Sequence, residues 1–113
     1  MTNEQIDRLL PFLKGFSAKS KLIIFLLASK YSPASIRKIK IRDLNKIKSL
    51  HKVADLARCV ELLDSGDSYV FAYPSGRGYS ESYILSVLER SYERCNLKYK
   101  SLNNFIKEIS GKK

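Results

Sequence analysis

An unbroken apolar run at residues 22–28, inside the segment KLIIFLLASK, constrains the fold more than any other feature of this sequence. The run lies in a predicted helix from Ser20 to Lys30 that is apolar on nearly all sides, so other elements must surround it. It is also much shorter than the roughly 20 residues that a membrane crossing requires. We therefore expect a soluble domain without a membrane partner, built around this central helix.

Length and charge narrow the classes of function. A chain of 113 residues predicts one domain over residues 1–113, large enough for one core but too small for an elaborate enzyme. Its 21 Lys and Arg residues against 11 Asp and Glu leave a formal charge of +10. This excess is greater than solubility requires, so a polyanion is the expected partner. Nucleic acid is preferred to an anionic membrane surface, so duplex DNA is the expected partner and no membrane partner is expected.

Metal, disulfide and secretion signals are weak in this chain. The sequence MTNEQIDRLL has neither a basic leader nor a cleavable apolar segment, so we expect a location in the host cell cytoplasm or nucleoid. Cys59 and Cys95 lack a CxxC pattern and Cys/His companions, which favours half-buried free thiols over a metal cluster. The sequence contains a single histidine, His51. A zinc site or a His-dependent catalytic triad is therefore not expected. No cofactor is expected.

Helical spacing of apolar residues recurs along the chain and predicts a mainly α, compact domain. Thr2 with Gln5 forms a capping box for the first helix, which Gly15 ends. The predicted helices span residues 3–14, 20–30, 33–40, about 53–63 and 80–95, and Ser101 is the expected cap of a final helix. A turn at residues 64–67, a brief strand or extended run at residues 68–73 and a loop at residues 74–78 complete the prediction.

A polar corner and a dense basic stretch follow the central helix. Ser32 before Pro33 is a strong helix start, because the hydroxyl caps free amides and proline loses nothing at the first helical position. Ile36 and Ile39 should point inward. The basic stretch contains Arg37, Lys38, Lys40, Arg42, Lys46, Lys48 and Lys52, with a single acid, Asp43.

A short helix after a tight corner and a buried helix has the geometry of helix-turn-helix DNA readers, although an ordinary solvated face is the plain alternative. The residues of this region expected to contact duplex DNA are Ser35, Arg37, Lys38, Lys40, Arg42, Lys46 and Lys48. Arg77, in the loop PSGRG, could reach a phosphate because its flanking glycines let the backbone approach closely. An ordinary surface turn is an equally good explanation of that loop.

The order of these elements resembles the catalytic domain of tyrosine recombinases and phage integrases over most of the chain. MTNEQIDRLLPFLKG resembles the opening helix of that domain, and LIIFLLASKYSPASIRKIKIRDL resembles its second and third helices. SYVFAYPSGRGYSESYILSVLERSYERCNLKY is similar to its later loop and the helix after it. The resemblance implies that the start of this helix enters the major groove. Tyr79, Ser80, Ser82 and Tyr83 would then face DNA, although Ser80 can also be a simple helix cap.

The positions that perform the chemistry of this family hold other residues. The arginine that holds the scissile phosphate corresponds to Ser32, which lacks a charged bidentate fork. The His-x-x-Arg-His signature falls on residues 103–107, with Asn103 and Ile106 at the histidine and the second arginine. The β-hairpin after Leu44 that bears a catalytic lysine is reduced or missing, and the helix with the tyrosine nucleophile has no counterpart before Lys113. The resemblance therefore implies no catalytic residue.

The leading hypothesis is a catalytically inactive DNA-binding protein of a phage or mobile element, with a regulatory, site-occupying or architectural role. A protein-interaction module that inhibits or modulates a recombinase or replication protein is the second hypothesis. The third is an active nuclease or strand-transfer enzyme, which needs a nucleophile that the sequence pattern does not identify.

Overall fold

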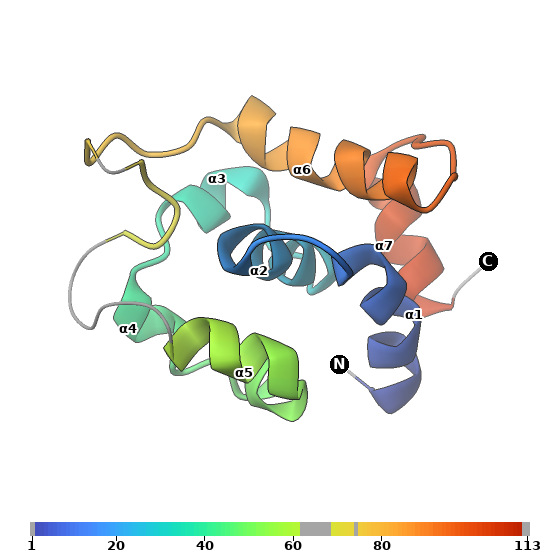
Figure 1. Cartoon of the computed structure of the whole chain (residues 1–113), viewed down its shortest axis with the longest axis horizontal. Coiled ribbons are helices and arrows are strands. Elements are labelled where there is room, and N and C mark those ends of the chain that lie inside the picture. Colours follow the sequence, from blue (N-terminus) through green and yellow to red (C-terminus); the bar gives the residue numbers. More distant parts are fainter. Residues whose placement is uncertain (1, 62–68, 74, 112–113) are drawn as a thin grey trace.

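The helix predicted at the centre of the fold is α2 (Ala18–Ala28), and residues 22–28 are all buried. The computed structural model describes residues 2–61, 69–73 and 75–111. Five helices contact α2 and enclose it (Figure 1): α1 (Asn3–Leu13), α3 (Pro33–Arg37), α5 (Ala54–Glu61), α6 (Glu81–Arg94) and α7 (Leu102–Ser110). The radius of gyration is 13.4 Å, close to the value of about 13 Å expected for a compact chain of this length. The mainly helical prediction is confirmed.

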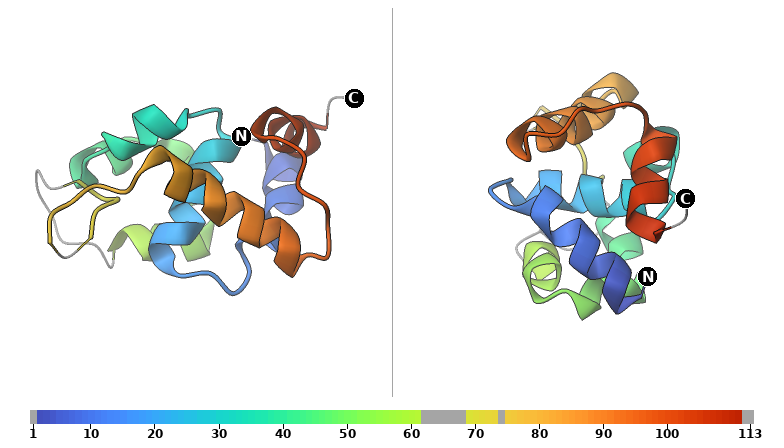
Figure 2. Two further views of the ribbon diagram at one scale, coloured as in Figure 1. Left: turned by 90° about the horizontal axis from the view of Figure 1, so that it is seen from above. Right: turned by 90° about the vertical axis from the view of Figure 1, so that its right-hand side faces the viewer.

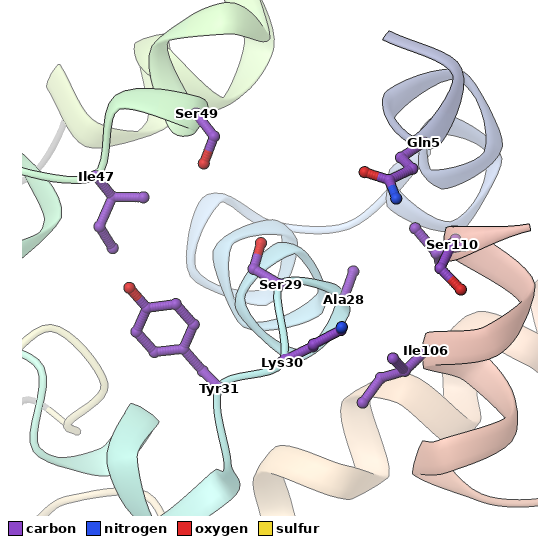
Figure 3. A pocket seen from close by; sticks show the side chains of 10 residues that line it. Gln5, Ala28, Ser29, Lys30, Tyr31, Ile47, Ser49, Ile106 and Ser110 are labelled. Carbon is purple, nitrogen blue, oxygen red and sulfur yellow. The ribbon is translucent and has the colours of Figure 1, made fainter. Parts of the chain in front are cut away.

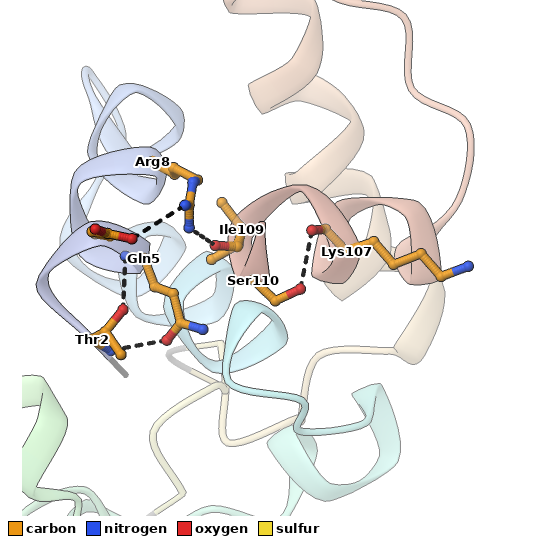
Figure 4. A network of polar contacts seen from close by, with 7 residues as sticks. Thr2, Gln5, Arg8, Lys107, Ile109 and Ser110 are labelled. Carbon is orange, nitrogen blue, oxygen red and sulfur yellow. Dashed lines mark hydrogen bonds and ion pairs between the residues drawn. The ribbon is translucent and has the colours of Figure 1, made fainter. Parts of the chain in front are cut away.

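Helices α1 and α7 lie together at one end of the domain, and a polar network joins them (Figure 4). The predicted capping box is present at the start of α1. The Gln5 amide donates to the Thr2 hydroxyl over 3.2 Å, and the Thr2 amide donates to the Gln5 side chain over 2.9 Å. One turn later, Arg8 Nη1 donates to the Ile109 carbonyl over 2.9 Å. This bond satisfies a carbonyl at the end of α7, which has no partner within its own helix.

The last turn of α6 packs against the end of α1. Ser91, which is fully buried, donates its hydroxyl to the Phe12 carbonyl over 2.5 Å. The Arg94 guanidinium lies 5.0 Å from the centre of the Phe16 ring. It also fills the space that a side chain at Gly15 would occupy, where the backbone has φ of +84°. Gly15 therefore both ends α1 and leaves room for α6 to approach.

Aromatic rings form the part of the core between α1, α6 and α7. The Phe12 ring lies 5.2 Å from the Tyr92 ring and 5.3 Å from the Phe105 ring, in tilted and edge-on arrangements that suit aromatic pairs. Tyr92 is almost fully buried, and its hydroxyl donates to the Glu108 carboxylate over 2.8 Å. A polar group buried in this way needs such a partner, so Glu108 fixes how α6 and α7 pack.

Alkaline pH is expected to destabilise the fold through Tyr92. Burial, with the hydrogen bond to Glu108, raises the pKa of Tyr92 above its ordinary value of 10.0. The contribution of this phenol to stability is therefore complete below about pH 10 and is lost as the pH rises toward the folded-state pKa. Tyr92→Phe should lower the free energy of unfolding at neutral pH by about 1 to 2 kcal/mol and make its alkaline decline shallower. Urea denaturation across this pH range measures both effects, and equal alkaline slopes in the two proteins would contradict the assignment.

The third helix is shorter than predicted, and residues 69–73 form isolated backbone bridges instead of a regular strand. Helix α3 ends at Arg37, after which the Ile39 carbonyl accepts a hydrogen bond of 3.1 Å from the Val70 amide. Lys40 and Tyr69 form an isolated antiparallel bridge, and Ala72 forms another with Gly78. Pairing with residues 69–70 and burial of Ile39 and Val70 thus replace the last turn of the predicted helix. Ser68 lies outside the described residues.

Two short elements that the sequence pattern did not predict connect α3 to α5. They are α4 (Ile41–Leu44) and a 3₁₀ helix, η1 (Lys48–Lys52). No β-hairpin is present in the stretch from residue 45 to residue 53, all of which is described. Helix α5 is described as far as Glu61, and Leu63 and the turn at residues 64–67 lie outside the described residues. Within the described part of the chain, no helix is long and apolar enough to cross a membrane.

Candidate nucleic-acid interface

The corner before α3 has the predicted local structure. Ser32 caps the helix, because its hydroxyl accepts a hydrogen bond of 3.1 Å from the Ser35 amide, and Pro33 occupies the first turn. Ile36 is fully buried, whereas Arg37 and Lys38 are exposed. Ser35 is exposed as well, and its side chain accepts a hydrogen bond from the Ser32 hydroxyl. Local capping and one buried isoleucine therefore present the basic side chains of α3 to solvent.

Arg37 connects α3 to the start of α6. Its Nε donates to the Tyr79 carbonyl over 2.7 Å, and Nη1 lies 3.8 Å from the Glu81 carboxylate. The first contact holds the guanidinium in place between the two helices. The second offsets part of its charge, by a modest amount because both side chains are about half exposed.

The loop before α6 is folded back on itself and carries Arg77. The Tyr73 amide donates to the Arg77 carbonyl over 2.8 Å, and the Gly76 amide donates to the Tyr73 carbonyl over 2.8 Å. Gly76 has φ of +90°, which a residue with a side chain rarely adopts. Figures 1 and 2 show this part of the chain at one end of the molecule, next to α3 and the start of α6. Arg77 is thereby brought to the same end as Arg37.

Two adjoining hollows lie between α3, the loop and α6. One has a volume of about 420 Å³, and its lining includes Arg37, Lys38 and Tyr69. The other has a volume of about 570 Å³, and its lining includes Arg37, Tyr73 and Arg77. We call the surface that contains both hollows the α3–α6 surface. Its charged, aromatic and hydroxyl residues are Arg37, Lys38, Lys40, Tyr69, Tyr73, Ser75, Arg77, Ser80 and Glu81.

Two further lysines, Lys40 and Lys19, contact tyrosines or the backbone at the edge of the α3–α6 surface. The Lys40 ammonium lies 5.6 Å from the centre of the Tyr69 ring, within the range of a cation–π contact. Lys19 Nζ donates to the Ala72 carbonyl over 3.1 Å and lies 6.0 Å from the Tyr79 ring. Lys40 is half-buried, so it is less available than Lys38 at the outer edge.

The residues predicted to face DNA at the start of α6 have mixed roles. Ser82 is exposed, and Ser80 is exposed while its hydroxyl caps the helix by accepting from the Tyr83 amide over 3.1 Å. Tyr79 and Tyr83 are half-buried and pack against the core, with ring centres 4.8 Å apart. Burial raises the pKa of Tyr79 above its ordinary value. The two tyrosines therefore support the loop more than they expose recognition groups.

Three predicted DNA contacts lie outside the α3–α6 surface. Arg42 belongs to α4, Lys46 follows it, and Lys48 begins η1, so all three lie on the connection that leads toward α5 (Figure 1). All three are exposed. The Lys40 backbone pairs with Tyr69, and none of these three residues is among the described lining of the two hollows.

A separate hollow lies at the end of α2 (Figure 3), with a volume of about 390 Å³. Lys30 lines it with φ of +73°, and the buried Ser29 hydroxyl has no hydrogen-bond partner. Tyr31, which precedes Ser32, and Ile106 also line it. The described lining contains one lysine and no arginine, and Ser32 is not part of it.

The histidine and the two cysteines of the chain lie outside the α3–α6 surface. His51 is exposed, and its neighbour Asp55 instead pairs with Lys21 over 2.7 Å. Cys59 is buried, more deeply than predicted, and burial raises the pKa of its thiol. Cys95 is a half-buried free thiol. Among the described residues, no group of three His, Cys, Asp or Glu side chains is arranged to hold a metal ion.

The sequence pattern did not identify Tyr69 and Tyr73 of the α3–α6 surface, nor Lys19, which lies beside it. Tyr69 and Tyr73 were placed in a strand because SYVFAY is rich in aromatic and β-branched residues, yet both side chains are exposed. Lys19 precedes the apolar run and carried no pattern of its own. The two tyrosines flank the consecutive buried residues Val70 and Phe71, so no period-two alternation signals their exposure. Comparisons of the chain with protein-family models, with curated proteins and with solved structures found no significant match.

Proposed function

We propose that this protein is a non-catalytic DNA-binding domain that binds duplex DNA through the α3–α6 surface. One observation carries the proposal: Arg37 and Arg77, which are distant in sequence, line the same hollow, and Lys38 and Lys40 lie at or beside the adjoining hollow. Cations gathered from separate segments create a positive field over a surface of several residues. Such a field attracts the phosphate backbone of DNA.

The geometry suits phosphate binding more than base reading. Guanidinium groups bind phosphate oxygens through paired donors, and the exposed Lys38 adds a flexible ammonium. Ser80 and Ser82 at the start of α6 offer hydroxyls beside these cations. Contacts to phosphate position a protein on DNA without reading its sequence, so most of the affinity should come from charge.

The resemblance to tyrosine recombinases supports the same surface and a loss of cleavage. In that family the start of the helix after the loop approaches DNA, and α6 has this place in the chain. Ser32 here is a helix cap, and Ile106 is an apolar wall residue of the hollow at the end of α2. Neither side chain supplies the permanently charged, bidentate donor with which an arginine stabilises a phosphoryl transition state. We therefore propose that the protein belongs to a phage or mobile element, where it occupies a DNA site, regulates a process on DNA or organises a DNA complex.

A salt titration of duplex binding tests the proposal. Four phosphate contacts, from Arg37, Lys38, Lys40 and Arg77, give an expected slope of about −3.6 for the logarithm of the association constant against that of salt. Fluorescence anisotropy with a labelled duplex measures it. Absence of binding at low salt would refute the proposal and favour a module that docks on a recombinase or replication protein. Nicking of supercoiled DNA by the purified protein would refute the proposal that the domain is non-catalytic.

A further inference from the structure

Two tyrosine rings of the α3–α6 surface are unusually open to solvent. Tyr69 is 52% exposed and Tyr73 is 43% exposed, whereas the nearby Phe71 is fully buried. Each open ring lines one of the two hollows, and each hollow also contains Arg37. An aromatic ring beside a cation therefore occurs twice on one surface.

Neighbouring side chains hold both rings. The Tyr73 ring lies 4.7 Å from the Tyr79 ring and 6.2 Å from the Tyr83 ring, and those two rings pack against the core. The Tyr69 ring lies beside the Lys40 ammonium, and the backbone of Tyr69 is bridged to Lys40. Rings that are already held in place lose little conformational entropy when a flat ligand stacks on them.

We infer that Tyr69 and Tyr73 stack on unpaired bases, so that DNA containing unpaired nucleotides is the preferred ligand. A paired base presents only its edge in a groove, whereas an unpaired base exposes the flat face that an aromatic ring can stack on. The adjoining cations, Lys38 and Arg77, then bind the phosphates of the same nucleotides. The two hollows, of about 420 Å³ and 570 Å³, have the size of ordinary small-ligand sites. This inference rests on the proposed function and names the form of DNA that it selects.

Anisotropy titrations at one salt concentration test the inference with three DNA ligands of matched sequence: a fully paired duplex, the same duplex with a central two-nucleotide bulge, and a single strand. The bulged duplex should bind at least about fivefold more tightly than the paired duplex, as expected for stacking on one or two bases. Tyr69→Leu and Tyr73→Leu should each reduce this preference, because they keep apolar volume but remove the ring. Tyr73→Phe should preserve it, since stacking does not need the hydroxyl.

The failure of this inference is distinguishable from the failure of the proposed function. Equal affinity for paired and bulged duplexes, with the expected salt slope, would overturn the inference and leave the proposed function standing. Retention of the full preference in both leucine variants would also overturn it. Absence of binding to all three ligands would overturn both. Circular dichroism of each variant verifies that the helices remain folded.

Discussion

Replacing Arg37, Lys38 and Lys40 together with alanine is expected to weaken duplex DNA binding by about 10- to 100-fold. The magnitude of the salt slope should fall by about 2 to 3, because each lost phosphate contact removes about 0.9 from it. All three side chains lie at or beside the hollow that Tyr69 lines, so their removal deprives one region of its positive field. Fluorescence anisotropy across a range of salt concentrations measures both quantities.

A second triple variant provides the matched control. Replacing Lys46, Lys48 and Lys52 with alanine removes the same formal charge from the connection between α4 and α5. Its affinity should change far less, and an equal loss in both variants would show that net charge alone drives binding. Glu81→Gln should act in the opposite direction and tighten binding, because it removes the carboxylate beside Arg37. Thermal melts are needed alongside, since the first variant also removes the hydrogen bond to the Tyr79 carbonyl.

Phe105→Ala is expected to lower the free energy of unfolding by about 3 to 5 kcal/mol. The Phe105 side chain is fully buried, and its ring lies 5.3 Å from Phe12 and 6.1 Å from Tyr92. Its loss leaves a cavity where α1, α6 and α7 meet. A loss of this size is a large fraction of the stability of a small domain, which is typically about 5 to 15 kcal/mol. Urea denaturation followed by circular dichroism measures the change.

Leu97→Ala is the control for this prediction. Leu97 is also a large apolar residue near the end of α6, but it is 50% exposed. Its replacement should change the free energy of unfolding by no more than about 0.5 kcal/mol. A comparably small loss in the Phe105 variant would mean that α7 contributes little to the core.

Features that depend on neighbouring residues in the sequence were predicted well. The caps at Ser32, Ser80 and Ser101 are confirmed, because each hydroxyl accepts from the amide three residues later in the chain. The central position of α2 is confirmed too, since a helix that is apolar on all sides must be enclosed. Local hydrogen bonding and the apolar pattern determine both kinds of feature.

Features that depend on pairing between distant segments were not predicted. The end of α3 is set by the hydrogen bond between the Val70 amide and the Ile39 carbonyl, and no helical propensity signals it. The same pairing places Tyr69 beside Lys40 and sends Lys46 and Lys48 toward α5. The sequence pattern therefore identified basic residues without indicating which of them share a surface.

By itself, the sequence determined that this chain has an enclosed apolar helix, capped helices around it and a large positive charge. Periodicity, capping and composition are properties of short segments, so they can be read without a structure. Only the tertiary structure decided that Arg37 and Arg77 line one hollow with Tyr73, and that Arg42, Lys46 and Lys48 lie elsewhere. The physical reason is that a surface is formed by contacts between distant residues, which depend on how the helices pack.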